Sequence, residues 1–156
     1  MPDTLALLDA YAAAVAAVPA RFSQRVGTTW RNPIPGATEA GRTWTGLNVA
    51  WAATGALSAA AVAPLLTQVS PMVIYLEAPS LPALTAAAAG LPPIEGGRLT
   101  VQPFPGVVTR RLAQTLDSGL GTVPWPRAYA DLRPTGVRGE EAAEHLAERM
   151  LNDHRV

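Results

Sequence analysis

The chain has 156 residues, no cysteine, and a formal net charge of zero from 12 basic and 12 acidic residues. The missing cysteine excludes disulfides, thiolate metal sites and a cysteine nucleophile. The balanced charge gives no electrostatic case for nucleic acid or an anionic membrane as the main partner. The length predicts a single domain over residues 1–156.

A helix is predicted at the N-terminus, because Asp3 can cap a helix that starts at Thr4 and Pro19 would end it. Its apolar positions recur at helical spacing and are Leu5, Leu8, Tyr11, Ala12, Val15 and Val18. The functional interpretation is a helix that forms a homodimer. The structural interpretation, which we prefer, is a helix that packs on the core.

The segment from residue 21 to residue 46 interleaves arginine with aromatic residues. This pattern is typical of nucleic-acid surfaces, where rings stack on bases and arginines contact phosphate. Prolines and glycines interrupt the segment, so a loop or hairpin that packs its tryptophans on the domain edge is the preferred prediction. With two later arginines included, the candidate nucleic-acid contacts are Arg21, Arg25, Trp30, Arg31, Arg42, Arg110 and Arg111.

The middle of the chain alternates strand-like and helical stretches, which favours an α/β domain, with α+β as the alternative. We expect a small central sheet flanked by helices, with helices at both termini. The clearest strand is 72–76, an apolar run typical of a strand buried on both faces. Other predicted strands are 99–101 and 106–109, and predicted helices are 56–63 and 80–89, the second ended by Gly90. A loop is predicted over 91–97, the stretch 112–121 is ambiguous and turn-rich, and 48–53 is either a strand or the start of a helix.

Thr54 and Gly55 break the chain between a strand-like stretch and a helical one. Such a junction can bind an anion at the helix N-terminus. One glycine is far short of a phosphate-loop or dinucleotide fingerprint. A plain tight turn is therefore the preferred interpretation.

The stretch 124–151 has the strongest helical signal in the chain. A short helix is predicted over 128–132, and a longer one is predicted to begin at Glu140, directly after Gly139. The apolar stripe of the longer helix consists of Ala142, Ala143, Leu146, Ala147, Met150 and Leu151. Between the two helices, Thr135 and Gly136 indicate a tight elbow.

Three polar residues, Tyr129, Asp131 and Arg138, are expected around this elbow. Asp131 and Arg138 are seven positions apart and could form an ion pair that fixes the angle between the helices, which is the preferred interpretation. The alternative is that Asp131 and Arg138 form a polar pocket with Tyr129. Arg138 could equally cap carbonyl groups at the end of the preceding helix.

This C-terminal stretch resembles the C-terminal domain of the AbiEi-type antitoxins, transcriptional regulators of type IV toxin–antitoxin systems. The resemblance rests on Tyr129-x-Asp131-Leu132 and on Gly136-x-Arg138-Gly139-x-Glu141-Ala142-Ala143-Glu144-x-Leu146. A second patch, Trp51-Ala52-Ala53-Thr54-Gly55 followed by Ser58-Ala59-Ala60, agrees, so the resemblance covers roughly residues 47 to 151. Family members usually carry a winged helix before this region, and the sequence leaves no room for one here.

The resemblance implies a non-catalytic antitoxin or regulator domain that oligomerises and need not bind its toxin directly. It implies that the motif residues Thr54, Gly55, Tyr129, Asp131, Arg138, Gly139 and Glu141 are the ones to follow in the structure. The alternative function is a DNA-binding protein in its own right that uses the arginines named above, with weak binding expected.

The third possibility is an enzyme with a pocket near Tyr129 and Asp131, but the chain carries few signs of catalysis. His145 and His154 are nine residues apart and would not share a ligand-binding face. The five aspartates are isolated and there is no lysine, so nucleotidyltransferase and nuclease patterns are missing. We therefore expect no enzyme activity, no metal and no cofactor. No segment is apolar for long enough to span a membrane, and a cytoplasmic location is expected.

Overall fold

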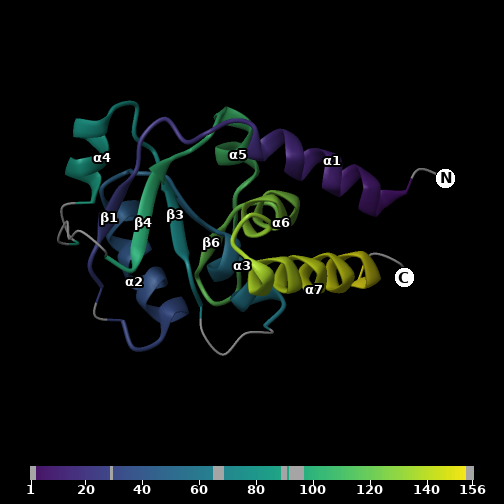
Figure 1. The fold of residues 1–156 in the computed structure, drawn as a ribbon. Helices are drawn as coiled ribbons and strands as arrows, with labels where there is room; N and C mark the ends of the chain where they lie inside the picture. The colour runs from purple at the N-terminus through teal and green to yellow at the C-terminus, as the bar shows by residue number, and fades with distance from the viewer. Residues whose placement is uncertain (1–2, 29, 65–68, 89–90, 92–96, 154–156) are drawn as a thin grey trace.

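The apolar run Met72–Leu76 (β3) lies in the middle of one mixed sheet, and its predicted strand is confirmed. The computed structural model describes residues 3–28, 30–64, 69–88, 91 and 97–153. The predictions for Gly90, for most of loop 91–97 and for His154 fall outside these residues. Within them, the expected α/β class with helices at both termini is confirmed (Figure 1).

Six strands form the sheet in the order β1-β4-β3-β2-β6-β5, with parallel pairs β4–β3 and β2–β6 and antiparallel pairs elsewhere. In chain order the elements are α1 Thr4–Ala16, β1 Gln24–Val26, α2 Pro33–Gly46, β2 Trp51–Thr54, α3 Gly55–Val62, β3 Met72–Leu76, α4 Leu81–Ala87, β4 Leu99–Pro103, α5 Val107–Leu112, β5 Gln114–Thr115, β6 Gly121–Thr122, α6 Trp125–Leu132 and α7 Val137–Asp153.

Side-chain alternation along the central strands divides the core into two layers. Tyr75 of β3 and Ala52 of β2 belong to the layer beneath α1, α6 and α7. Ile74 and Leu76 of β3 point to the other face, where α2 and α4 cover them. Figure 1 shows α6 and α7 on one side of the sheet and α2 and α4 on the other. β3 is therefore buried on both faces, as its continuous apolar sequence predicts.

The N-terminal helix is present, and Asp3 caps it by accepting a 3.1 Å hydrogen bond from the Leu5 backbone N–H. Its predicted apolar stripe is only partly correct. Leu8 and Ala12 are buried, whereas Leu5 and Tyr11 are exposed. The helix is apolar around most of its circumference but packs on one side only, against α6.

The loop predicted between residues 21 and 46 is wrong, because this segment holds strand β1 and the 14-residue helix α2. Pro33 opens the helix, where a missing N–H costs nothing. Gly36 and Gly41 are needed because the rings of Trp30 and Trp51 occupy the space that a Cβ would take. The proline therefore starts a helix and the two glycines allow close packing, and none of the three marks a turn.

Two further predictions need correction. A strand was expected at 106–109, but Val107–Leu112 forms the helix α5. Both edges of β4 are already paired, with β1 and β3, so Val107 and Val108 have no free edge of that strand to pair with. The last helix, α7, begins at Val137 rather than Glu140, so Gly139 lies inside it. Its stripe residues Ala142, Ala143, Leu146 and Ala147 are buried as predicted.

Among the residues that the structure describes, none of the helices combines the length and the apolar character needed to cross a bilayer.

Candidate functional site

Helix α6 positions the most extensive side-chain hydrogen-bond cluster among the described residues. It packs against α1, α3 and α7, and Pro126 sits in its first turn, where proline is tolerated. Residues four apart on a helix share a face, whereas residues two apart point to different sides. Arg127 and Asp131 therefore point together towards the sheet, and Tyr129 points elsewhere.

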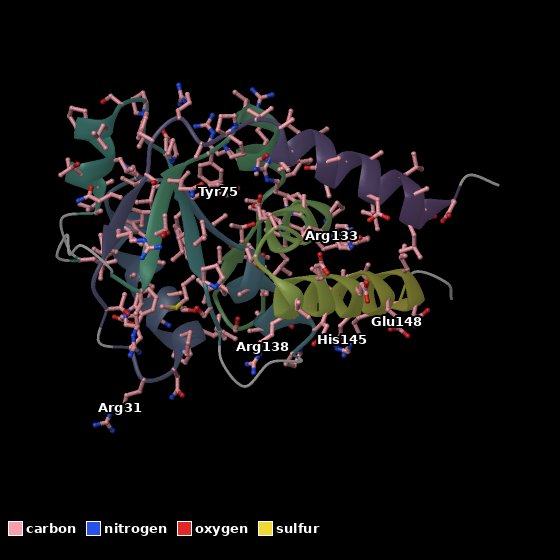
Figure 2. The ribbon with its side chains drawn as sticks, viewed as in Figure 1. Arg31, Tyr75, Arg133, Arg138, His145 and Glu148 are labelled. Carbon is pink, nitrogen blue, oxygen red and sulfur yellow. The ribbon has the colours of Figure 1, made fainter. Side chains whose placement is uncertain are left out.

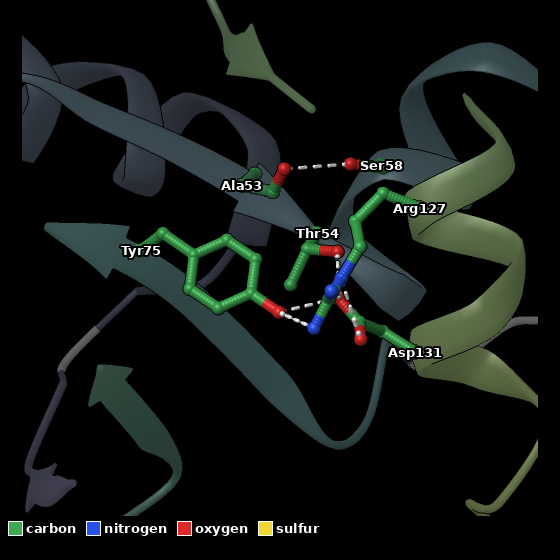
Figure 3. A network of polar contacts seen from close by, with 6 residues as sticks. All are labelled: Ala53, Thr54, Ser58, Tyr75, Arg127 and Asp131. Atoms are coloured by element: carbon green, nitrogen blue, oxygen red, sulfur yellow. Dashed lines mark hydrogen bonds and ion pairs between the residues drawn. The ribbon is translucent and has the colours of Figure 1, made fainter. Parts of the chain in front are cut away.

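The Asp131 carboxylate accepts hydrogen bonds from three side chains (Figure 3). Thr54 Oγ1, at the end of β2, donates to Oδ2 at 2.6 Å, and Tyr75 OH, on β3, donates to the same atom at 2.6 Å. Arg127 Nε lies 3.2 Å from both carboxylate oxygens, and its Nη2 donates to Tyr75 OH at 3.0 Å. One carboxylate thus connects α6 to two neighbouring strands. We call Thr54, Tyr75, Arg127 and Asp131 the Asp131 cluster.

The Asp131 cluster is well shielded from solvent. The side chains of Arg127 and Asp131 are 16% and 17% exposed, and Thr54 and Tyr75 are buried. Burial and the neighbouring carboxylate raise the pKa of Tyr75 well above its usual range, which Arg127 only partly opposes. Burial alone would lower the pKa of Arg127, but the Asp131 carboxylate beside it raises that pKa instead. Tyr75 is therefore a neutral donor and Arg127 a fixed cation.

Tyr129 and Asp131 do not form the shared pocket that was the alternative prediction. The Tyr129 hydroxyl donates to Asp9 Oδ1 of α1 at 2.8 Å, and Arg133 approaches the same oxygen at 3.6 Å. Burial and the hydrogen bond to Asp9 raise the pKa of Tyr129 to about 12. Tyr129 therefore holds α1 against α6, on a different side of the helix from the Asp131 cluster.

The predicted ion pair between Asp131 and Arg138 is also wrong. Asp131 is occupied by the Asp131 cluster, while Arg138 lies exposed in the first turn of α7, beyond the elbow (Figure 2). Gly136 turns the chain at this elbow with a φ of +97°. Glu141 is exposed as well.

Gly139 has a clear structural role at the elbow. A Cβ at this position would overlap Thr135 Oγ1 and crowd the Leu132 carbonyl oxygen. Thr135 Oγ1 itself donates to that carbonyl at 2.6 Å, which closes the end of α6. The motif glycine therefore allows α7 to start directly against the end of α6.

The Thr54–Gly55 junction is a turn from β2 into α3, with Gly55 at a φ of +56°. The sequence suggested that this junction could bind an anion, and in the structure a carboxylate of the chain itself lies there. The Asp131 carboxylate lies against Thr54, the N-cap residue of α3, where negative charge is favourable. A second buried pair lies nearby, where Ser58 Oγ donates to the Ala53 carbonyl at 2.9 Å and also contacts Thr122 Oγ1.

The candidate nucleic-acid arginines come from different parts of the structure. Arg42 pairs with Glu39 at 3.2 Å, and Arg110 pairs with Glu77 at 3.1 Å. Arg31 lies at one end of the molecule and α5, which carries Arg110 and Arg111, at the other (Figures 1 and 2). Arg25 is exposed on the edge strand β1, and Trp30 is half-buried against α2. These residues form no single basic surface among the described residues.

A cleft of about 580 Å³ lies beside the Asp131 cluster. Its walls come from the end of α1 and the segment after it, from the end of β4 with the residues that follow, and from α6. Tyr75, Arg127, Asp131 and Arg21 form part of its lining. Sequence reasoning missed Tyr75 and Arg127. The four-residue spacing of Arg127 and Asp131 was a usable signal, whereas nothing in the sequence pointed to Tyr75.

No group of three or more metal-ligating side chains occurs in the part of the chain that the structure describes. Comparison with known proteins finds no matching family model, no matching curated protein and no matching solved structure.

Proposed function

We propose that this chain is a non-catalytic antitoxin-like or regulator-like domain of a type IV toxin–antitoxin system. The observation that carries the proposal is the hydrogen bond between Thr54 and Asp131. The resemblance to AbiEi-type antitoxins rests on two patches, one around Thr54 and one around Asp131. Their meeting in one cluster supports the interpretation that both belong to one structural unit.

The environment of Asp131 supports a non-catalytic role. Its carboxylate is the only acidic motif residue inside the domain, and Thr54, Tyr75 and Arg127 all donate to it. A general base must offer a free lone pair to a substrate proton. Here Oδ2 accepts from Thr54 and Tyr75, and Arg127 Nε lies against both oxygens, so the carboxylate is engaged mainly in holding α6 to the sheet. The motif Gly139 likewise serves packing.

A growth experiment tests the proposal. The genomic neighbourhood of this chain's gene is searched for a nucleotidyltransferase-like toxin gene. Such a toxin gene is then expressed in a bacterial host, with and without the chain. Growth restored by the chain supports the proposal. Glu148→Ala, an exposed change on α7 outside the motif, should restore growth equally well. Continued growth arrest in cells that contain the folded chain would contradict the proposal.

A second measurement addresses catalysis directly. The purified chain is incubated with magnesium and with nucleoside triphosphates, RNA or DNA, and product formation is followed. We expect no turnover. Magnesium-dependent turnover that Asp131→Asn abolishes, in a variant that keeps its fold, would show instead that the Asp131 cluster is an active site.

A further inference from the structure

We propose that the cleft beside the Asp131 cluster binds a small organic monoanion, a carboxylate on an aromatic or aliphatic body. The cleft volume of about 580 Å³ falls within the range of small-molecule sites, which is roughly 300–1,000 Å³. This inference concerns a ligand and does not depend on the antitoxin-like function.

The walls suit the apolar body of such a ligand. Val15 and Val18 contribute from the end of α1 and just beyond it, and Phe104 contributes from the segment after β4. The centroid of the Phe104 ring lies 5.7 Å from that of the Tyr75 ring, so two aromatic rings lie together in the wall of the cleft. Small-molecule sites typically have mainly apolar walls and a small number of polar groups in fixed positions.

Arg127 supplies a fixed polar group at the cleft. Its Nε and Nη2 are used by Asp131 and Tyr75, but among the described residues none accepts a hydrogen bond from Nη1. The same residues contain no buried side-chain nitrogen or oxygen without a partner, which is consistent with Nη1 being open to the cleft. Because Arg127 lines the cleft, the two N–H groups of Nη1 are available to an acceptor bound there.

The net charge of the lining favours a ligand that carries a single negative charge. Two arginines, Arg21 and Arg127, and one aspartate, Asp131, line the cleft, so its net charge is +1. Asp131 already neutralises Arg127, and the extra charge belongs to Arg21, which is exposed. A monoanion such as a carboxylate matches this net charge of +1 and leaves no surplus charge in a partly shielded site.

The test uses 2-naphthoate as the probe and the full chain labelled with ¹⁵N for NMR. A ligand of this size and ordinary efficiency would bind with a Kd of about 1 mM. We expect saturable shifts of backbone amides that line the cleft, namely those of Ala14, Val15, Ala16, Val18, Ala20, Arg21, Gln102, Phe104, Ala130 and Asp131. The neutral 2-naphthylmethanol should bind more weakly. The absence of saturable shifts, or shifts confined to other surfaces, would overturn the proposal.

Two pairs of variants sharpen the test. Arg21→Ala should weaken 2-naphthoate binding about two- to fivefold, as expected for an exposed charge, and should leave 2-naphthylmethanol unaffected. Arg25→Ala, an exposed arginine outside the lining, is its control. Ala14→Trp should fill the cleft and abolish binding, whereas Ala13→Trp, exposed on α1 but outside the lining, should not. Equal effects within either pair would show that binding occurs elsewhere.

Discussion

Thr54 and Asp131 are 77 residues apart in the chain and are joined by a 2.6 Å hydrogen bond. Tyr75 donates to the same carboxylate oxygen, so Asp131 on α6 holds the ends of β2 and β3 together with the helix. Hydrogen bonds to a charged group contribute more than neutral ones, about 1.5–3 kcal/mol each. The Asp131 cluster is therefore a principal link between the helical layer and the sheet.

Replacing Asp131 by alanine should destabilise the fold by about 3–5 kcal/mol, because it leaves a shielded Arg127 cation without its partner. The free energy of unfolding is measured by urea denaturation. Asp153→Ala is the matched control, since Asp153 pairs with Arg149 at 3.7 Å in an exposed position and should change stability by no more than about 0.5 kcal/mol. Similar losses in the two variants would mean that the Asp131 cluster contributes little.

Leu146→Ala should cost about 2–5 kcal/mol, because Leu146 is fully buried where α7 meets the core and its loss opens a cavity. Glu144, two positions earlier on the same helix, is exposed, and Glu144→Ala should leave the free energy of unfolding almost unchanged. Thermal and urea unfolding of both variants measure the difference. Equal shifts of the melting midpoint would show that the buried face of α7 is assigned wrongly.

Gly139→Ala should destabilise the elbow by about 1–3 kcal/mol, because the new Cβ would overlap Thr135 and crowd the Leu132 carbonyl. Gly46→Ala is the control, since a Cβ at this position at the end of α2 meets nothing within 4 Å. That change should be neutral or stabilise by up to about 1 kcal/mol. A tolerated alanine at position 139 would contradict the close contact between α6 and α7.

The sequence was sufficient for elements defined by local pattern. The β-branched and aromatic residues of the run 72–76 predict a strand, and the three- and four-residue spacing of apolar residues in α7 predicts its buried face. The local pattern gave a wrong prediction for α2, because its prolines and glycines are typical of a loop. Those residues are explained by the rings of Trp30 and Trp51, which reach the helix through tertiary packing.

The candidate site was predictable only in part, for a similar reason. Asp131 was singled out, but the partner predicted for it, Arg138, lies beyond a turn that redirects the chain. Its real partners Thr54 and Tyr75 are 77 and 56 residues away, and only the sheet brings them together. Sequence spacing reports partners on the same helix, such as Arg127, and carries no signal for partners on other elements.

Alkaline pH should destabilise the chain through its buried tyrosines. The pKa of Tyr129 is raised to about 12 and that of Tyr75 is raised further, so both hydroxyls stay protonated in the fold after unfolded tyrosine, with a pKa of about 10, has ionised. The unfolded state then binds fewer protons, and stability falls from about pH 10 upwards. The contribution of Tyr129 is present below pH 10 and is lost as the pH rises to about 12.

Urea unfolding at a series of alkaline pH values measures this loss. Tyr129→Phe should make the fall in stability with pH shallower, because it removes one of the groups that ionise on unfolding. Tyr11→Phe, an exposed position on α1, is the matched control for the loss of a tyrosine. A pH dependence that Tyr129→Phe leaves as steep as before would contradict the buried, hydrogen-bonded state of Tyr129.

Duplex DNA should bind the isolated chain weakly and without sequence preference, with a Kd of about 10⁻⁴ M or weaker at physiological salt. The net charge is zero, and two of the candidate arginines, Arg42 and Arg110, already pair with glutamates. Arg31 and α5 lie at opposite ends of the molecule, so one duplex face would meet only part of the set (Figures 1 and 2). The exposed glutamates of α7 would also repel phosphate.

A salt titration of binding to random and candidate promoter duplexes measures this affinity. Non-specific contacts should weaken steeply as salt rises, because phosphate binding releases counterions. A reading surface would instead require several side chains on one element that reach base edges in a groove. Nanomolar binding at physiological salt, with a clear preference for one duplex, would contradict the prediction. In that case Arg21, Arg25, Arg31 and Arg42 are the first residues to replace, since they lie closest together in the sequence.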